Sequence, residues 1–241
     1  MISSLKIGAL VALLLFAMTP CPAEAQVRPE LSIQPVVGIP QGGFADNVSR
    51  AGIGIDVMAG LRIQDTPALI GLDVAYMNYG IERRSEPFSR TIPDVTVDVR
   101  TTNDIILTHL LLRLQPEEGV LRPHVDGLFG FKYLFTSTRI EDRGSPTRDP
   151  VASSVNFDDF ALSYGVGAGL DIRVFQYERE NEARQAMRNI YLTMGARYLW
   201  GQEAEYLRRG SIERVDGDLR FDVRRSRTDL LNFSLGITLQ F

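Results

Sequence analysis

The chain has 241 residues, 44% of them hydrophobic and 23% charged, and its 26 Lys and Arg residues against 30 Asp and Glu residues give a net charge of −4. This composition excludes a disordered acidic tail and a bundle of apolar transmembrane helices, and the acidic balance argues against a nucleic-acid-binding protein. The single cysteine, Cys21, excludes an internal disulfide framework and a cysteine-rich zinc site.

Residues 1–25 have the three parts of a secretory signal peptide. Lys6 supplies a positive charge, residues 7–18 form an apolar stretch, and Ala23-Glu24-Ala25 provides the small residues that signal peptidase requires. The apolar stretch is too short to cross a bilayer as a helix, which takes about 20 residues. We therefore expect cleavage after Ala25 and a mature chain, residues 26–241, that contains no cysteine.

The mature chain alternates between apolar and polar or small residues with a period of two. Between Ala51 and Gln64 the odd positions carry only Ala, Ile, Val and Leu, whereas the even positions carry Gly, Asp, Met, Arg and Gln. Successive side chains of a β-strand point to opposite faces, so this pattern predicts strands with one apolar and one polar face. The pattern recurs in residues 30–40, 51–64, 68–80, 97–114, 121–136, 159–174, 188–201 and 229–241.

The predicted strands and their connections have the dimensions of a membrane-spanning barrel. Each segment is longer than a typical globular strand of about 5–6 residues, and a tilted strand that crosses a bilayer needs about 9–11. The connections 65–67 and 115–120 are short, whereas longer and polar connections lie at 41–50, 81–96, 137–158 and 202–228. Such asymmetry is typical of outer-membrane barrels, which have short turns on the periplasmic side. The long charged connection 175–187 departs from it, and nothing in the sequence explains this connection.

Glycines on the polar face indicate that this face lines the lumen. Glycine weakens a strand that faces water, but it fits the crowded interior of an eight-stranded barrel. We therefore expect the apolar face to point toward lipid; the alternative is a secreted lipocalin-like barrel with its apolar face inside. Aromatic residues on the apolar face, mostly near the long-loop ends, fit an interfacial girdle. They are Tyr76, Phe131, Tyr133, Phe135, Tyr164, Tyr198, Trp200 and Phe233.

Several segments resemble those of a known family. They are LSIQPVVGIPQGGF (31–44), LLLRL (110–114), RPHVDGLFGFKYLF (122–135), GVGAGLDIR (165–173) and LGITLQF (235–241). In these segments the mature chain resembles the small outer-membrane β-barrels of the OmpA/OmpX type. The resemblance implies an all-β, eight-stranded, antiparallel up-and-down transmembrane barrel in a bacterial outer membrane. It also implies a C-terminal aromatic signal for the barrel-assembly machinery, here Phe241 with Phe233.

Charged residues and both histidines fall on the face that is expected to line the lumen. They are Asp56, Arg62, Asp73, His109, Arg113, His124, Asp126, Lys132, Asp171, Arg173 and Arg197. Because buried charges require partners, this set predicts a salt-bridged plug; an ion or proton path is the alternative. A turn centred near Glu117–Glu118 would pair His109 with Asp126 and Leu111 with His124.

No catalytic constellation is evident. The two histidines lie within predicted strands, no serine is placed to partner them, and Asp216-Gly217-Asp218 lacks the rest of a calcium loop. We predict no enzymatic activity, no metal and no cofactor. A lipid-modifying enzyme that uses His109 or His124 is the less favoured alternative.

The connection 202–228 is rich in arginine and in acidic residues. Its pairs Arg208–Arg209 and Arg224–Arg225 suggest a contact with lipopolysaccharide phosphates, because guanidinium groups bind phosphate well. A solvated hairpin with internal ion pairs is the favoured interpretation. We predict a structural or surface-interaction protein that contacts outer-membrane lipids and recognises an unspecified partner through its outer loops, with a narrow passive channel as the alternative.

Overall fold

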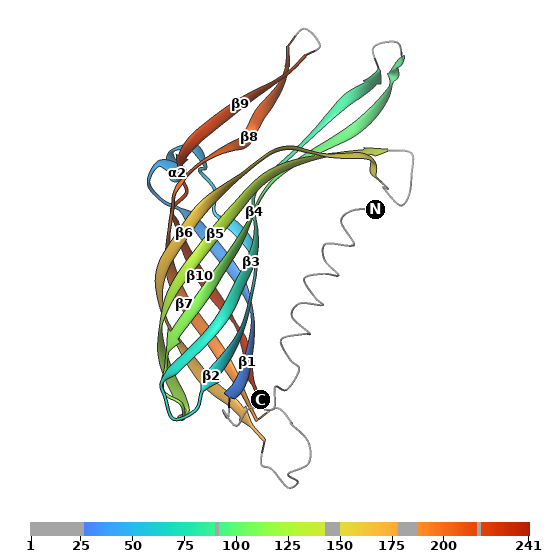
Figure 1. Cartoon of the computed structure of the whole chain (residues 1–241). Coiled ribbons are helices and arrows are strands. Elements are labelled where there is room, and N and C mark those ends of the chain that lie inside the picture. Colours follow the sequence, from blue (N-terminus) through green and yellow to red (C-terminus); the bar gives the residue numbers. More distant parts are fainter. Residues whose placement is uncertain (1–26, 90–91, 143–149, 178–187, 216–217) are drawn as a thin grey trace.

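The computed structural model describes residues 27–241 except 90–91, 143–149, 178–187 and 216–217. The predicted leader at 1–25 therefore lies outside the described residues, as does most of the connection 175–187. Over the described residues the chain forms a closed barrel of eight antiparallel strands and a separate two-stranded hairpin (Figure 1). The predicted fold class, an eight-stranded up-and-down barrel, is confirmed.

The wall strands follow one another in chain order, and the last closes against the first. They are β1 (Val27–Pro40), β2 (Gly52–Ile63), β3 (Ala68–Ser89), β4 (Ile92–Leu114), β5 (Leu121–Asp142), β6 (Pro150–Gln176), β7 (Asn189–Gly201) and β10 (Leu230–Gln240). The hairpin consists of β8 (Glu203–Val215) and β9 (Asp218–Arg227), and a short helix, α2 (Gly42–Asn47), follows β1. Within the described ranges no helix is long and apolar enough to cross a membrane.

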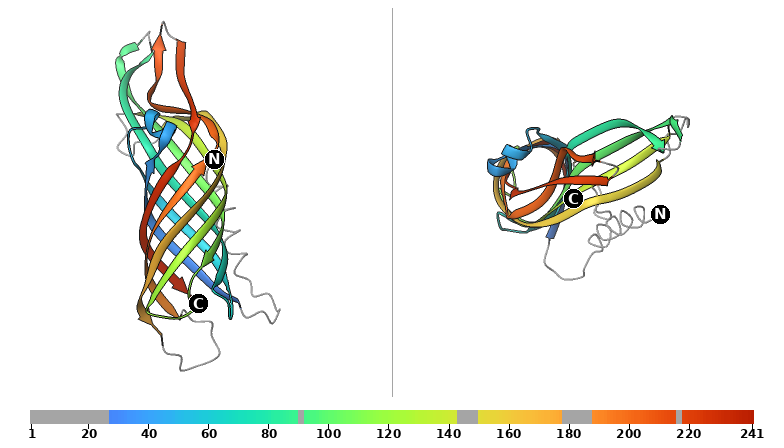
Figure 2. Two further views of the ribbon diagram at one scale, coloured as in Figure 1. Left: turned by 90° about the vertical axis from the view of Figure 1, so that its left-hand side faces the viewer. Right: turned by 90° about the horizontal axis from the view of Figure 1, so that it is seen from above.

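Three of the predicted long connections prove to be largely strand. The β3–β4 ladder continues to the pair Ser89–Ile92 and the β5–β6 ladder to the pair Glu141–Pro150, whereas β8 and β9 pair with each other as a hairpin. These strands rise from one end of the barrel, whereas the short turns and the C-terminus lie at the other (Figure 1). Seen from above, the wall strands form a ring and the extended ends of β3–β6 lean to one side (Figure 2). The alternation fades in these extensions because neither face of a strand beyond the wall has to be apolar.

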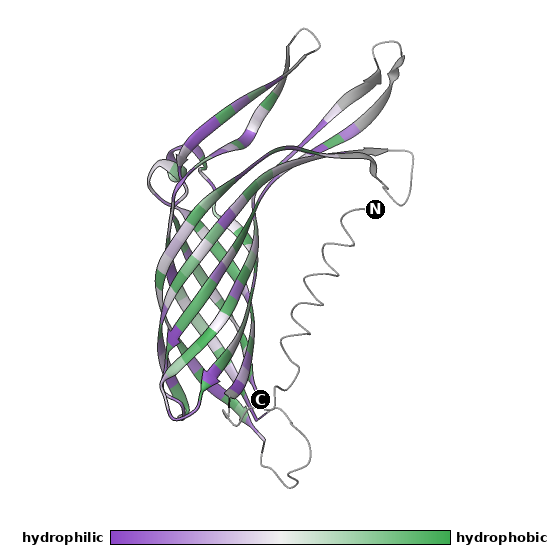
Figure 3. Cartoon of the chain, in the orientation of Figure 1, coloured by the Kyte–Doolittle hydropathy of each residue, from purple (hydrophilic) through white to green (hydrophobic). Residues whose placement is uncertain are grey.

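Apolar side chains cover the outside of the wall, and charged and polar side chains face inward together with buried apolar ones such as Met58, Leu107 and Leu128. Along β1, Ile33 is 48% exposed, whereas its neighbours Ser32 and Gln34 are 0% and 1% exposed. Figure 3 shows the same interleaving of apolar and polar residues along the other wall strands. A lipocalin-like barrel would have the opposite arrangement, so the predicted orientation of the two faces is confirmed.

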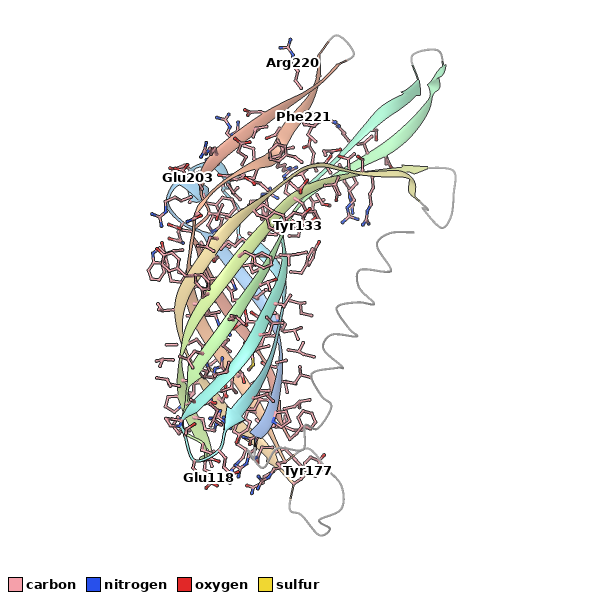
Figure 4. The ribbon with its side chains drawn as sticks, viewed as in Figure 1. Glu118, Tyr133, Tyr177, Glu203, Arg220 and Phe221 are labelled. Carbon is pink, nitrogen blue, oxygen red and sulfur yellow. The ribbon has the colours of Figure 1, made fainter. Side chains whose placement is uncertain are left out.

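Aromatic side chains form two contacting groups on the outside of β5, β6 and β7, which together make an aromatic band. Tyr133 packs against Phe160 with ring centroids 4.5 Å apart, and Trp200 packs against Tyr164 and Tyr198 at 5.5 and 5.0 Å. Tyr133 lies toward the end of the wall from which the extensions rise (Figure 4). The band has the position expected of an interfacial girdle, since amphipathic rings gather where the apolar wall gives way to water.

Candidate functional site: the lumen clusters and the hairpin arginines

At the short-turn end of the lumen, Glu30 of β1 holds two buried arginines. Its Oε1 accepts hydrogen bonds from Arg62 Nε at 2.7 Å, Arg122 Nη2 at 3.1 Å and Gln240 Nε2 at 3.1 Å. The Oε1 atom of Gln115 accepts further bonds from both arginines. This Glu30 cluster (Glu30, Arg62, Gln115, Arg122, Gln240) ties β1, β2, β5 and β10 together and fills the lumen at this level.

Further along the lumen, Arg197 of β7 binds carboxylates from three other strands. Its Nη1 lies 3.0 Å from Asp56 Oδ2 and 2.8 Å from Asp73 Oδ2, and its Nε lies 3.3 Å from Asp126 Oδ2. Asp126 also receives two bonds from Arg113, at 2.7 and 2.9 Å. The Arg197 cluster (Asp56, Asp73, Arg113, Asp126, Arg197) therefore joins β2, β3, β4, β5 and β7 through two guanidinium groups and three carboxylates.

The predicted pairing of His109 with Asp126 is wrong. In the β4–β5 ladder His109 faces Gly130, Arg113 faces Asp126, and Leu111 faces Leu128 rather than His124. The turn is centred further along the chain than Glu117–Glu118, because Gly119 is the residue that takes the positive φ of 130°. The register that results brings Arg113 into its two hydrogen bonds with Asp126.

His109 has a serine partner that the sequence did not reveal. Its Nε2 lies 3.0 Å from Ser163 Oγ of β6. Gly130 lies between them, opposite His109 on one side and opposite Ser163 on the other, so two strands come into reach across a residue without a side chain. Asp73 faces His109 in the β3–β4 ladder. The three residue types of an acyl-transfer site thus lie together, and all three residues are buried inside the wall.

The other predicted lumen residues lie outside the Arg197 cluster. His124 Nδ1 lies 3.6 Å from Asp171 Oδ1, and Asp171 Oδ2 accepts a bond from Gln115 at 2.6 Å. Lys132 Nζ donates to the carbonyl oxygens of Leu199 and Thr228. Arg173 is half-buried beside a register shift in β6 and lies outside both lumen clusters. Across the described ranges no group of three or more His, Cys, Asp or Glu residues is arranged to hold a metal ion.

Sequence reasoning missed Glu30, Gln115 and Arg122. Two of them could have been predicted, because residues two apart on a strand point to the same face. Glu30 is two residues from the inward Ser32, and Arg122 is two residues from the inward His124. Both stand at the ends of predicted strands, where a polar residue is equally expected in a turn. Gln115 lies beyond the end of β4, where periodicity gives no direction.

Three of the four hairpin arginines that were predicted to contact lipopolysaccharide form ion pairs within the hairpin. Arg208 and Arg224 share Asp222 at 3.3 and 2.8 Å, and Arg225 binds Glu203 at 3.1 Å. These contacts agree with the favoured interpretation of this segment as a hairpin with internal ion pairs. Three of the four guanidinium groups predicted to contact lipopolysaccharide are thus already engaged within the hairpin.

The two phenylalanines of the predicted assembly signal lie at β10. Phe233 is exposed on the outer wall, and Phe241 follows the strand and donates its backbone N–H to Pro29 O at 3.1 Å. Their role in assembly stays a prediction.

No protein-family model matches the chain, and no curated protein does. Among solved structures the chain is similar to neisserial surface protein A, with 11% identity over 89% of this chain and 95% of that chain and a TM-score of 0.36. It is similar to the N-terminal β-barrel domain of Pseudomonas aeruginosa OprF, with 13% identity over 90% and 100% of the two chains and a TM-score of 0.35. It is also similar to a major outer membrane protein of Thermus thermophilus, with 11% identity over 88% of this chain and 99% of that chain and a TM-score of 0.41. The barrel assignment itself rests on the strand pairing.

Proposed function

We propose that this protein is an integral outer-membrane barrel that holds a rigid recognition surface outside the cell and does not conduct ions. The observation that carries the proposal is the contrast between the two sides of the wall. Leu110 and Ile53 on the outside are 63% and 69% exposed, whereas Arg113 and Lys132 on the inside are 1% and 0% exposed. Lipid covers the first kind of surface favourably, and a water-filled channel would leave the second kind accessible.

The remaining features fit the same location. A closed barrel satisfies every backbone hydrogen bond between neighbouring strands, as a structure in hydrocarbon must. In this proposal the leader at 1–25 directs export, the assembly machinery reads Phe233 and Phe241, and the aromatic band lies at the outer headgroup level. Outer-membrane lipids and lipopolysaccharide then surround the wall.

The extensions above the wall supply the recognition surface. The β8–β9 hairpin is fixed to the extended β3, because Arg84 Nη1 donates to Ile212 O at 2.7 Å and Gly210 N donates to Glu82 Oε2 at 2.7 Å. A surface that is ordered before binding loses less conformational entropy when a partner docks. The proposed role is therefore structural and interactive rather than enzymatic; lipid modification by His109 or His124 is disfavoured because both face the closed lumen.

Cysteine labelling tests the location and the topology. Arg220 and Glu118 lie at opposite ends of the molecule (Figure 4), and the predicted mature chain has no cysteine of its own. On intact cells a membrane-impermeant maleimide is expected to label Arg220→Cys but not Glu118→Cys, and permeabilising the outer membrane is expected to expose Glu118→Cys. Labelling of Glu118→Cys on intact cells, or protection of Arg220→Cys, would refute the proposed orientation.

A narrow channel is the second candidate. It is favoured by buried polar atoms without hydrogen-bond partners along the described lumen, among them Glu30 Oε2, Asp56 Oδ1 and His109 Nδ1. In a planar bilayer we expect the purified protein to give no conductance steps above background. Steps that change with Asp126→Asn or Lys132→Met would establish the channel and overturn the proposal of a sealed lumen.

A further inference from the structure

A pocket of about 360 Å³ opens at the loop end of the molecule, between the segment after α2, the upper part of β3 and β8. Its lining residues include three arginines and no acidic residue. The lining residues that matter for its chemistry are Asn47, Ser49, Arg50, Arg208, Arg209 and Gly210. The pocket belongs to neither lumen cluster, and the proposed structural role makes no use of it.

A local irregularity of β8 brings two consecutive arginines to this one pocket. Successive side chains of a regular strand point to opposite faces, so Arg208 and Arg209 would normally diverge. The β8–β9 register shifts between Leu207 and Ile212, and Gly210 has a φ of 80°, which a residue with a side chain rarely adopts. Both arginines therefore line the pocket.

Hydrogen bonds hold the pocket walls in place. Arg208 N donates to Ser211 Oγ at 3.0 Å, which fixes the irregular turn of β8. Asn47 Nδ2 donates to Tyr206 Oη at 3.1 Å, and Tyr206 Oη lies 2.7 Å from Ser226 Oγ. The last two bonds connect the helix side of the pocket to both strands of the hairpin. The backbone segments that carry the arginines are therefore held in fixed positions relative to each other.

The charges in the pocket are only partly compensated. Arg208 shares Asp222 with Arg224 at its outer side. Neither Arg50 nor Arg209 occurs among the ion pairs found in the described part of the chain. A concave site lined by three arginines and by no acidic residue favours an anion, and guanidinium forks match the geometry of phosphate oxygens.

We propose that this pocket binds a phosphorylated sugar. Arg50, Arg208 and Arg209 hold the phosphate, and Ser49 provides a hydroxyl group for the sugar. The volume is much larger than a phosphate ion needs and suits a small saccharide that carries one. The proposal replaces the hypothesis of four hairpin arginines with a defined set, in which Arg50 enters and Arg224 and Arg225 are left out.

Binding to the purified mature protein in detergent micelles tests the site without reference to its location in a membrane. The probe is glucosamine 1-phosphate, titrated calorimetrically, with glucosamine as the ligand that lacks the phosphate. We expect binding of the first and not of the second, and at least a tenfold loss of affinity in Arg50→Ala/Arg209→Ala. The matched control, Arg225→Ala/Arg227→Ala, removes the same charge from hairpin positions whose ion pairs, with Glu203 and Asp229, involve no pocket residue, and it is expected to stay within twofold of the wild type.

An equal loss in both double variants would show that only the overall charge matters and would overturn the proposal, as would the absence of binding. Heat-modifiable migration on a gel checks that each variant is folded, and Arg209→Lys provides a milder second variant, which keeps the charge but loses the fork and should bind less tightly than the wild type.

A second arm identifies where the sugar comes from. If phosphate-bearing glycolipid co-purifies with the wild type and is lost from Arg50→Ala/Arg209→Ala, the ligand is a headgroup of the outer leaflet. If the wild type is free of glycolipid but binds the soluble probe, the ligand comes from the medium. This arm rests on the proposed outer-membrane location, whereas the micelle titration does not, so a failure of one is distinguishable from a failure of the other.

Discussion

Replacement of Arg197 by methionine is expected to lower the free energy of unfolding by about 3–5 kcal/mol, because it removes one partner from a buried ionic cluster. Asp56 and Asp73 receive hydrogen bonds from Arg197, and both are 2% exposed. Without Arg197 these two carboxylates stay in the lumen with no guanidinium within hydrogen-bonding distance in the described cluster. Asp126 is affected less, since it keeps both bonds from Arg113.

Urea titration of the protein folded in micelles measures this loss, with heat-modifiable migration as a second readout of the closed barrel. Two variants separate lost charge from lost packing. Arg197→Lys keeps one positive charge but cannot reach three carboxylates with a fork, so its loss should be smaller. Arg197→Met with Asp56→Asn and Asp73→Asn removes the unpaired charges and should recover part of the stability. An Arg197→Met protein as stable as the wild type would contradict the ionic account of the lumen.

The wall strands of this barrel could be predicted because the alternation that marks them depends only on neighbouring residues in the sequence. A strand between lipid and a packed lumen must alternate, and Leu31 to Ile39 do so one residue at a time. The same parity assigned Asp56, Asp73, Asp126 and Arg197 to the lumen without any knowledge of their partners. The extended ends of β3 to β6 were missed as strands because a ladder surrounded by water puts no such demand on its side chains. The hairpin at 202–228 was the favoured interpretation of its charge pattern, not of any alternation.

The partners inside the barrel depend on information that is not local. Arg197 meets Asp56 across 141 residues, and His109 meets Ser163 only after β5 has come between them in register. Misplacing the centre of the 115–120 turn by two positions shifts every partner in the β4–β5 ladder by four residues, which is how His109 was assigned Asp126 instead of Gly130. The arginine pocket is harder still, since it depends on a register shift within β8 that no alternation marks.

Replacement of Glu30 by alanine is the second change from which we expect a large effect, a loss of about 3–5 kcal/mol in the free energy of unfolding. Arg62 and Arg122 are both fully buried and both donate to Glu30 Oε1. In the variant they keep the amide oxygen of Gln115, and Arg122 keeps its position 4.4 Å above the Tyr191 ring, but they have no carboxylate from β1. Two like charges then remain close together in the lumen.

The damage should be concentrated where the barrel closes. Glu30 lies opposite Gln240 in the β1–β10 ladder and also accepts a hydrogen bond from its side chain. Amide hydrogen exchange is therefore expected to accelerate along β1 and β10 before it does so along β3 and β6, which contribute no residue to the Glu30 cluster. Glu30→Gln keeps a neutral acceptor of the same shape and should lose less stability than Glu30→Ala. A uniform acceleration around the whole barrel would argue against a special role of Glu30 at the closing seam.

A compensated variant decides whether charge is the cause. Buried ionic triads of one carboxylate and two guanidinium groups are often replaceable by apolar side chains of similar volume with little loss of stability, because the desolvation cost of all three charges disappears together. Glu30→Leu with Arg62→Met and Arg122→Leu should therefore be more stable than Glu30→Ala, although it differs from the wild type at three positions. If the triple variant is no more stable than Glu30→Ala, the contribution of this cluster comes from its hydrogen bonds to Gln115 and Gln240 and from the Tyr191 contact, and the pairing of charges is secondary.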